Sequence, residues 1–97
     1  MKDQGRAPFV VRPRGEIDLA SAPRLHRELT CALDTHQNVL LDLSQVTFMD
    51  CSGLGALVQA RNQADRTGGR LALRGVGHPV ARLLRLTGLT GRLGPVP

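Results

Sequence analysis

Short apolar runs that are typical of strands alternate along this chain with longer segments of helical periodicity. Strands that are joined through a helix can pair in parallel, and the connecting helices then pack on the resulting sheet. The pattern therefore predicts an α/β domain. The expected strands are 9–12, 15–18, 38–46, 70–76 and a last short strand within 89–96. The expected helices are 22–33, 52–67 and 78–88.

The second expected helix has the clearest periodicity. Its apolar positions share one side, where only the aliphatic stem of Arg61 can join the core. These positions are Leu54, Leu57, Val58 and Ala64. Ser21 is a favourable N-cap for the first helix, and Gly68 and Gly88 are typical residues to end the other two. The almost continuous apolar run 38–46 predicts a single buried strand.

Length and composition limit the class of protein. The 97 residues fit one domain, 1–97. No apolar run reaches the roughly 18 residues that a membrane span needs, and the N-terminal segment has no signal-peptide core. Cys31 and Cys51 lack the spacing of a zinc site or a disulfide framework. We therefore expect a cytoplasmic protein that has no metal and no contact with a membrane.

The charge is distributed unevenly. Residues 1–50 carry six Lys or Arg and seven Asp or Glu, a net charge of −1, whereas residues 51–97 carry seven Arg and one Asp, a net charge of +6. A basic half can bind nucleic acid. However, these arginines are spread over several elements, and Phe9 and Phe48 are the only aromatic residues. Solvated basic faces are thus favoured over nucleic-acid binding.

The segment DCSGLG, residues 50–55, places Ser52 at the N-terminus of the second expected helix. A helix N-terminus has unpaired N–H groups and about half a positive charge, which would stabilise a phosphate locally. Gly53 and Gly55 would let the active site of another protein approach the hydroxyl, and Asp50 would orient the serine or repel a later phosphate. In a second interpretation, Ser52 is only an N-cap and the glycines make room for contact between helix and sheet.

Other chemistry has less support in the sequence. A P-loop motif is missing, and GLG alone does not make a dinucleotide site. A serine nucleophile needs a positioned base, and nothing in the sequence links His26, His36 or His78 to Ser52. Cys51 is interpreted as a buried, inert thiol rather than a redox switch. The chain is therefore predicted not to be an enzyme.

Four segments together resemble the STAS domain, and specifically the small stand-alone bacterial anti-sigma-factor antagonists. They are GEIDLASAPRL (15–25), VLLDLSQVTFMDCSGLGAL (39–57), GGRLALRGV (68–76) and VARLLRLTGL (80–89). The resemblance covers about residues 9–93. It implies a four- or five-stranded, mostly parallel or mixed sheet with helices mainly on one face. The N- and C-termini are shorter than is usual for the antagonists, so we expect an uncovered sheet edge or apolar strip through which the chain associates with itself.

The resemblance also implies a function. Antagonists of this family bind an anti-sigma factor that is a serine kinase of the GHKL type, and this releases the sigma factor. The kinase, with its own ATP and Mg²⁺, phosphorylates the serine of the motif, which is Ser52 here, and the antagonist then dissociates. A phosphatase resets it, and the antagonist needs no cofactor of its own. The implied partner-binding residues are Asp18, Asp50, Cys51, Gly53, Leu54 and Gly55.

Some alternatives remain open at this stage. Asp18 can instead be a turn-forming residue that binds its own backbone. The chain can also be a STAS interaction subunit of a stress-signalling or lipid-transport complex, in which Ser52 is never modified. A nucleic-acid-binding module that uses the basic half is the third hypothesis. The sequence pI of about 11.0 favours a partner with an acidic rim.

Overall fold

The structure is a computed structural model that describes residues 8–87. Strands and helices alternate in this range as expected. The strands are β1 (Phe9–Val11), β2 (Gly15–Ile17), β3 (Asn38–Asp42), β4 (Val46–Met49) and β5 (Arg70–Arg74). The helices are α1 (Ala22–Thr35), α2 (Cys51–Thr67) and α3 (His78–Thr87). The strand expected within 89–96 and the expected helix end at Gly88 lie outside the described residues.

The five strands form two parallel sheets. In the larger sheet β3 lies between β1 and β5, with Val39 opposite Phe9 on one side and Leu71 on the other. In the smaller sheet β2 pairs with β4, with an irregularity between Gly15 and Glu16. Every described pair is parallel, so the predicted α/β class is confirmed.

The prediction of one strand over 38–46 was wrong, because β3 ends at Asp42 and the chain turns before β4. The backbone N–H of Ser44 donates to Asp42 Oδ1 at 2.9 Å, and Val46 N–H donates to the carbonyl of Leu43 at 3.0 Å. A carboxylate that binds the backbone two residues ahead competes with a strand ladder. The turn allows β4 to leave the larger sheet and pair with β2.

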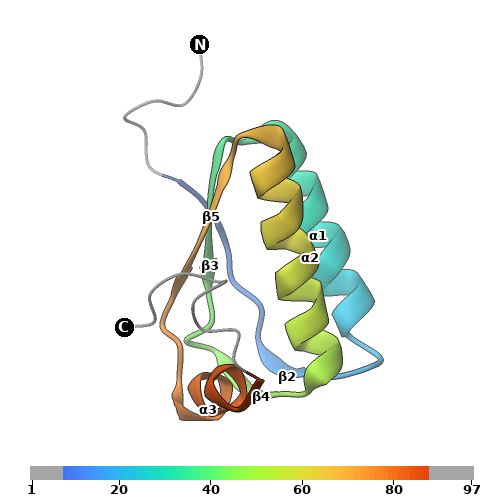
Figure 1. The fold of residues 1–97 in the computed structure, drawn as a ribbon. Coiled ribbons are helices and arrows are strands. Elements are labelled where there is room, and N and C mark those ends of the chain that lie inside the picture. Colours follow the sequence, from blue (N-terminus) through green and yellow to red (C-terminus); the bar gives the residue numbers. More distant parts are fainter. Residues whose placement is uncertain (1–7, 88–97) are drawn as a thin grey trace.

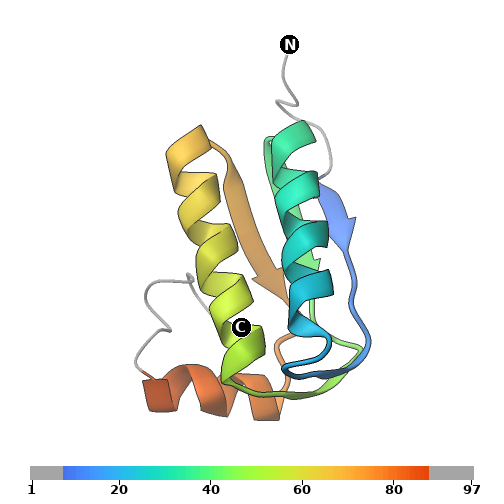
Figure 2. The same ribbon diagram turned by 90° about the vertical axis from the view of Figure 1, so that its right-hand side faces the viewer.

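Helices α1 and α2 lie side by side on one face of the larger sheet, and both run in the opposite direction to its strands (Figures 1 and 2). Between these helices and the sheet lies an aliphatic core. Its fully buried side chains include Leu29, Leu41, Leu43, Leu57 and Leu84. Helix α3 crosses the end of the sheet where the strands finish and packs against β4, burying Val80 and Leu84.

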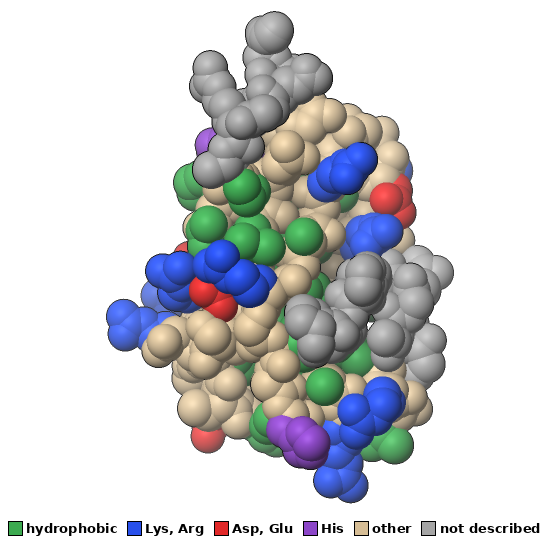
Figure 3. Space-filling view, turned by 90° about the vertical axis from the view of Figure 1, so that its left-hand side faces the viewer, with side chains coloured by type: hydrophobic (Ala, Val, Ile, Leu, Met, Phe, Trp, Pro, Cys, Tyr) green, Lys and Arg blue, Asp and Glu red, His purple; other side chains and the backbone are tan. Residues whose placement is uncertain are grey.

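The other face of the larger sheet carries an apolar row beside a charged cluster. Val10, Leu40 and Ala72 are aligned across the three strands, and Val10 and Ala72 are exposed. Figure 3 shows hydrophobic side chains gathered on this face next to basic and acidic ones. The row fits the expected apolar strip among the described residues. Self-association through it stays a prediction.

The charged cluster on this face is centred on Asp42 and was missed in the sequence. Asp42 is buried, and its Oδ2 accepts hydrogen bonds from Arg12 Nε at 3.0 Å and Arg74 Nη2 at 3.1 Å. Its hydrogen bonds, first of all that from Ser44 and then those from the two guanidinium groups, hold the pKa of Asp42 well below its usual range. The cluster therefore ties β3 to the segment after β1 and to the end of β5.

Candidate functional site

The β2–α1 turn and the β4–α2 turn meet at one end of the molecule. They lie where the parallel strands finish and the two long helices begin (Figure 1). The backbone N–H of Asp50 donates to the carbonyl of Ile17 at 3.1 Å, so the ends of β4 and β2 are held together. In open α/β proteins, ligands bind beyond the carboxyl ends of the strands. The motif around Ser52 therefore lies at the end where binding is expected.

Asp50, not Ser52, is the N-cap of α2. Its Oδ1 accepts hydrogen bonds from the backbone N–H of Ser52 at 2.8 Å and of Gly53 at 3.3 Å. Ser52 is the second residue of the helix, and its hydroxyl makes no hydrogen bond to the described part of the chain. The interpretation of Ser52 as a simple N-cap is therefore wrong. The helix begins without any help from its hydroxyl.

The Ser52 groove lies between the first turns of α1 and α2, with a volume of about 360 Å³. Leu19, Ala22, Pro23 and His26 line it from the α1 side, and Cys51, Ser52, Gly55, Ala56 and Gln59 line it from α2. Ser52 is half-buried on its wall rather than enclosed. The groove gives an approaching protein access to this part of the surface.

The two glycines of the motif have different surroundings. A Cβ on Gly53 would lie 2.7 Å from both Ile17 Cγ2 and Met49 Cγ, so this glycine allows α2 to approach β2 and β4 closely. A Cβ on Gly55 would have no heavy atom within 4 Å. Gly55 lines the groove, so only this glycine leaves space that a partner can enter. Gly53 fits the packing interpretation.

The other residues of the motif differ in whether a partner can reach their side chains. Leu54 is 4% exposed and belongs to the core, so its side chain is not available to a partner in this conformation. The prediction that Cys51 is a buried thiol was wrong, because Cys51 is exposed and lines the groove. Of the predicted partner-binding residues of the motif, Cys51 and Gly55 therefore lie on the accessible wall.

Asp18 forms the turn before α1. Its Oδ1 accepts hydrogen bonds from the backbone N–H of Ala20 and of Ser21, both at 3.1 Å. The hydrogen bonds from Ser21 are the main cause of the lowered pKa of Asp18. The turn-forming role is thus present, while the second carboxylate oxygen makes no hydrogen bond among residues 8–87. A role of this oxygen in partner binding stays a prediction.

Ser21 precedes α1 as expected, but its side chain does not cap the helix. Its hydroxyl donates to the carbonyl of Glu16 at 3.0 Å and accepts from the N–H of Asp18 at 3.0 Å. These bonds shape the β2–α1 turn, which places Leu19 at the groove with 76% of its surface exposed. Leu19 was missed in the sequence, because a single apolar residue in a turn carries no periodic signal.

His26 is the one histidine that the structure brings to Ser52, since both line the same groove. Its position depends on the contact between two parallel helices, which local sequence does not reveal. His36 lies elsewhere: its ring stacks on Phe9 with centroids 4.3 Å apart. His78 is exposed at the start of α3.

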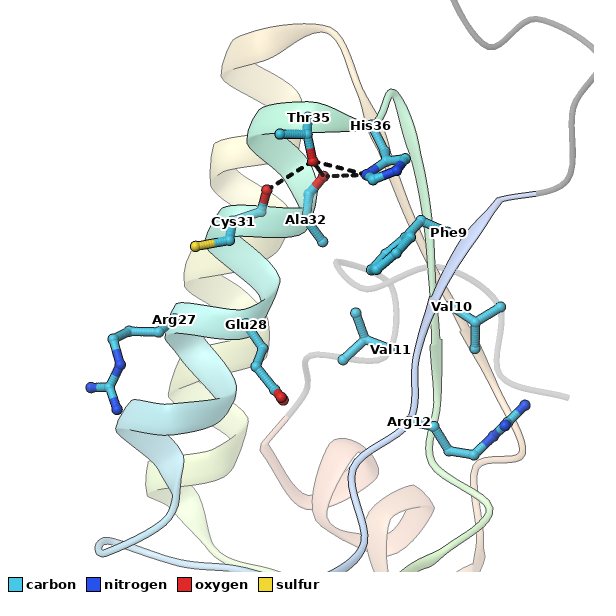
Figure 4. A pocket seen from close by; sticks show the side chains of 10 residues that line it. All are labelled: Phe9, Val10, Val11, Arg12, Arg27, Glu28, Cys31, Ala32, Thr35 and His36. Atoms are coloured by element: carbon cyan, nitrogen blue, oxygen red, sulfur yellow. Dashed lines mark hydrogen bonds between the residues drawn. The ribbon is translucent and has the colours of Figure 1, made fainter.

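A larger groove of about 580 Å³ lies between β1 and α1 (Figure 4). Phe9, Val11 and Ala32 form its apolar part, while Arg27 and Glu28 lie along α1. None of the predicted site residues lines it. Within the described residues, the structure contains no group of three side chains suited to hold a metal ion. Each helix between residues 8 and 87 is too short or too polar to cross a bilayer.

Comparisons with known proteins agree with this geometry. A sequence model of the STAS domain matches residues 1–95. The chain is 33% identical over 86 residues to the anti-sigma F factor antagonist of Paenibacillus polymyxa, covering 87% of this chain and 74% of that protein. It is 35% identical over 86 residues to the anti-sigma-B factor antagonist of Bacillus subtilis strain 168, covering 89% of this chain and 79% of that protein. A crystal structure of an anti-sigma factor antagonist from Mycobacterium paratuberculosis superposes with a TM-score of 0.78 at 29% identity, covering 91% of this chain and 75% of that one.

Proposed function

Because the chain belongs to the STAS family, we propose that it is an anti-sigma-factor antagonist whose binding is switched off by phosphorylation of Ser52. The two relatives described above carry the name of antagonist and match most of this chain. The proposal depends on two observations: Ser52 lines an open groove at the start of α2, and its hydroxyl makes no hydrogen bond within residues 8–87.

The partner that fits is an anti-sigma factor that is itself a serine kinase of the GHKL type. It transfers the γ-phosphoryl group of ATP, with Mg²⁺, to Ser52. A bond forms between Ser52 Oγ and phosphorus, the bond to the leaving ADP breaks, and the hydroxyl proton passes to a base of the kinase. ATP and Mg²⁺ belong to the kinase, and a separate phosphatase in the same cytoplasm removes the phosphate. The antagonist itself needs no cofactor.

The proposed binding surface surrounds the groove. Leu19 provides an exposed apolar side chain, and Asp18 next to it has one carboxylate oxygen outside the turn. Gly55 leaves room for a partner side chain beside Ser52. An exposed apolar side chain beside a charged group matches the apolar core and polar rim of protein interfaces. The unphosphorylated chain would bind the kinase here and release the sigma factor.

Phosphorylation would act at this surface. A phosphoserine adds about −1.5 to −2 charges, and Ser52 lies two residues after Asp50, which already carries a carboxylate. An acidic partner surface facing these groups would be repelled, and an apolar one would have to bury the added charge. A 100-fold loss of affinity requires only about 2.7 kcal/mol. Because the hydroxyl of Ser52 makes no hydrogen bond within the described chain, the fold should survive the modification.

The test is phosphorylation by the cognate anti-sigma factor, followed by intact-mass measurement. We expect one added phosphate on the wild-type chain in the presence of ATP and Mg²⁺, and none on Ser52→Ala, which should still bind the kinase. Cys51 and Asp50 stay unchanged in that variant, so it changes only the acceptor oxygen. A wild-type chain that gains no phosphate, in a reaction where a control substrate is modified, would refute the switch.

A further inference from the structure

A phosphate on Ser52 would find three N–H groups of the first turn of α2 already occupied. The N–H groups of Ser52 and Gly53 both donate to Asp50 Oδ1, and the N–H of Leu54 donates to the carbonyl of Asp50 at 3.1 Å. The N-terminal end of α2, which would otherwise favour a phosphate, therefore already binds the carboxylate of Asp50, and this carboxylate would repel the phosphate. A further donor from outside the first turn of α2 would therefore stabilise the phosphorylated form.

The groove supplies one such donor from α1. Helices α1 and α2 run side by side in the same direction (Figure 2), so the second turn of α1 lies beside the beginning of α2. His26 comes from that turn and is half-buried in the groove. Among the described residues that line the groove, it is the only one whose side chain can become a cation. Gly55 leaves the space beside Ser52 open, since a Cβ there would touch no heavy atom within 4 Å.

We propose that His26 is the counter-charge of phosphorylated Ser52, with its imidazolium ring donating a hydrogen bond to the phosphate across the groove. The inference rests on the proposed function and adds a residue from the neighbouring helix to the switch. A protonated ring and a phosphate dianion form a charge-assisted hydrogen bond, which is stronger than one between neutral groups. The phosphorylated state would thus be held most firmly where the ring is charged and the phosphate is a dianion.

Within residues 8–87, few other titratable groups lie near Ser52 and His26. Cys51 lines the same groove, and Asp18 and Asp50 lie in the two adjoining turns, where each uses Oδ1 to bind backbone N–H groups. Arg24 and Arg27 are exposed on α1 and do not line the groove. The two aspartates would raise the pH at which the phosphate loses its second proton. A phosphate midpoint that is lower in the wild type than in a variant without His26 can therefore be assigned to a cation in the groove, because the helix end is the same in both chains.

The test is a ³¹P NMR titration of the folded chain with phosphoserine placed at position 52 by chemical synthesis. Because no kinase is used, the result for His26 is independent of whether the chain is a kinase substrate. We expect the phosphate midpoint in His26→Gln to lie about half a unit or more above that of the wild type, since a nearby opposite charge lowers such a value. His36→Gln is the matched control, because that ring stacks on Phe9 away from the groove, and it should give the wild-type midpoint.

Equal midpoints in the wild type and His26→Gln would overturn the proposal, and so would an equal shift in His36→Gln. His26→Lys gives a second comparison, which stands even if the glutamine variant does not fold. A lysine keeps a cation in the groove at every pH of the titration, so its midpoint should be as low as that of the wild type. A midpoint about half a unit above the wild-type value in His26→Lys would also refute the pairing.

Discussion

Alanine substitution at the two glycines of the motif tests whether Gly53 is needed for close packing of α2 and whether Gly55 leaves space for a partner. In Gly53→Ala the new methyl group would lie 2.7 Å from Ile17 Cγ2 and from Met49 Cγ, and 3.3 Å from Ile17 Cβ. Carbon atoms in good contact are about 3.5–4.0 Å apart, so both neighbours must move by roughly 1 Å. Ile17 is 3% exposed and Met49 is 4% exposed, which leaves them little room. In Gly55→Ala the same methyl group points into open space.

The magnitude follows from two opposing effects. Overpacking a filled core costs about 1–3 kcal/mol. Alanine also favours a helix over glycine by up to about 1 kcal/mol, and this gain applies to both variants because both positions lie in the first turns of α2. The gain therefore cancels in the comparison. We expect Gly53→Ala to have a free energy of unfolding about 1–3 kcal/mol below that of Gly55→Ala.

Urea denaturation followed by circular dichroism measures this difference, provided that the slope of the transition is the same in all three chains. Gly55→Ala should be at least as stable as the wild type, and it should weaken binding of the anti-sigma factor because the methyl group narrows the groove. If the two alanine variants are equally stable, then Gly53 does not set the distance between α2 and the strands, and the packing argument fails.

Three further substitutions address the cap, the buried acid and the switch. Asp50→Ala should lower the free energy of unfolding by about 0.5–2 kcal/mol, the usual effect of losing an N-cap, while Asp50→Asn keeps an acceptor oxygen and should lose much less; equal losses in urea denaturation would contradict the capping role. The lowered pKa of Asp42 means that its stabilisation is complete above its unfolded pKa and is lost as the pH falls towards the folded value, so the stability gap between the wild type and Asp42→Asn should shrink below about pH 4. A gap that is constant between pH 7 and pH 2.5 would rule out this linkage. Ser52→Asp should weaken binding of the anti-sigma factor in calorimetry with little change in melting temperature, and wild-type affinity in that variant would count against the charge mechanism.

The order of strands and helices could be predicted because it depends on periodicity within short segments. Residues 22–33 and 52–67 repeat their apolar positions at helical spacing, and they form α1 and α2 with ends close to those expected. The break after Asp42 was missed because it depends on a side chain that binds the backbone locally, in a segment that otherwise has the composition of a strand. Periodicity shows which face of an element is buried, but it does not show where a side chain competes with a neighbouring strand for the backbone N–H groups.

Two features that the sequence did not predict, the Asp42 cluster and the position of His26, depend on neighbours far apart in the chain. The cluster around Asp42 needs β3 to lie between β1 and β5, an order that no single segment specifies. His26 reaches the groove only because α1 and α2 pack in parallel with their first turns side by side. Capping was misassigned for a simpler reason: Asp50 and Ser52 are both good N-cap residues, and a shift of two residues in the helix start decides between them.

That shift of two residues matters for regulation. If Ser52 were the N-cap, its hydroxyl would hold the first turn of α2, and a phosphate on it would disturb the helix start. With Asp50 as the cap, the helix keeps its hydrogen bonds whether or not Ser52 is modified. The carboxylate of Asp50, which caps the helix in place of Ser52, also accepts hydrogen bonds from the N–H groups of Ser52 and Gly53. These N–H groups would otherwise be free to bind the phosphate. A protein built in this way can change its surface charge without changing its fold. A counter-charge on a neighbouring element would then stabilise the phosphate, and His26 of α1 is the described groove residue that can supply it.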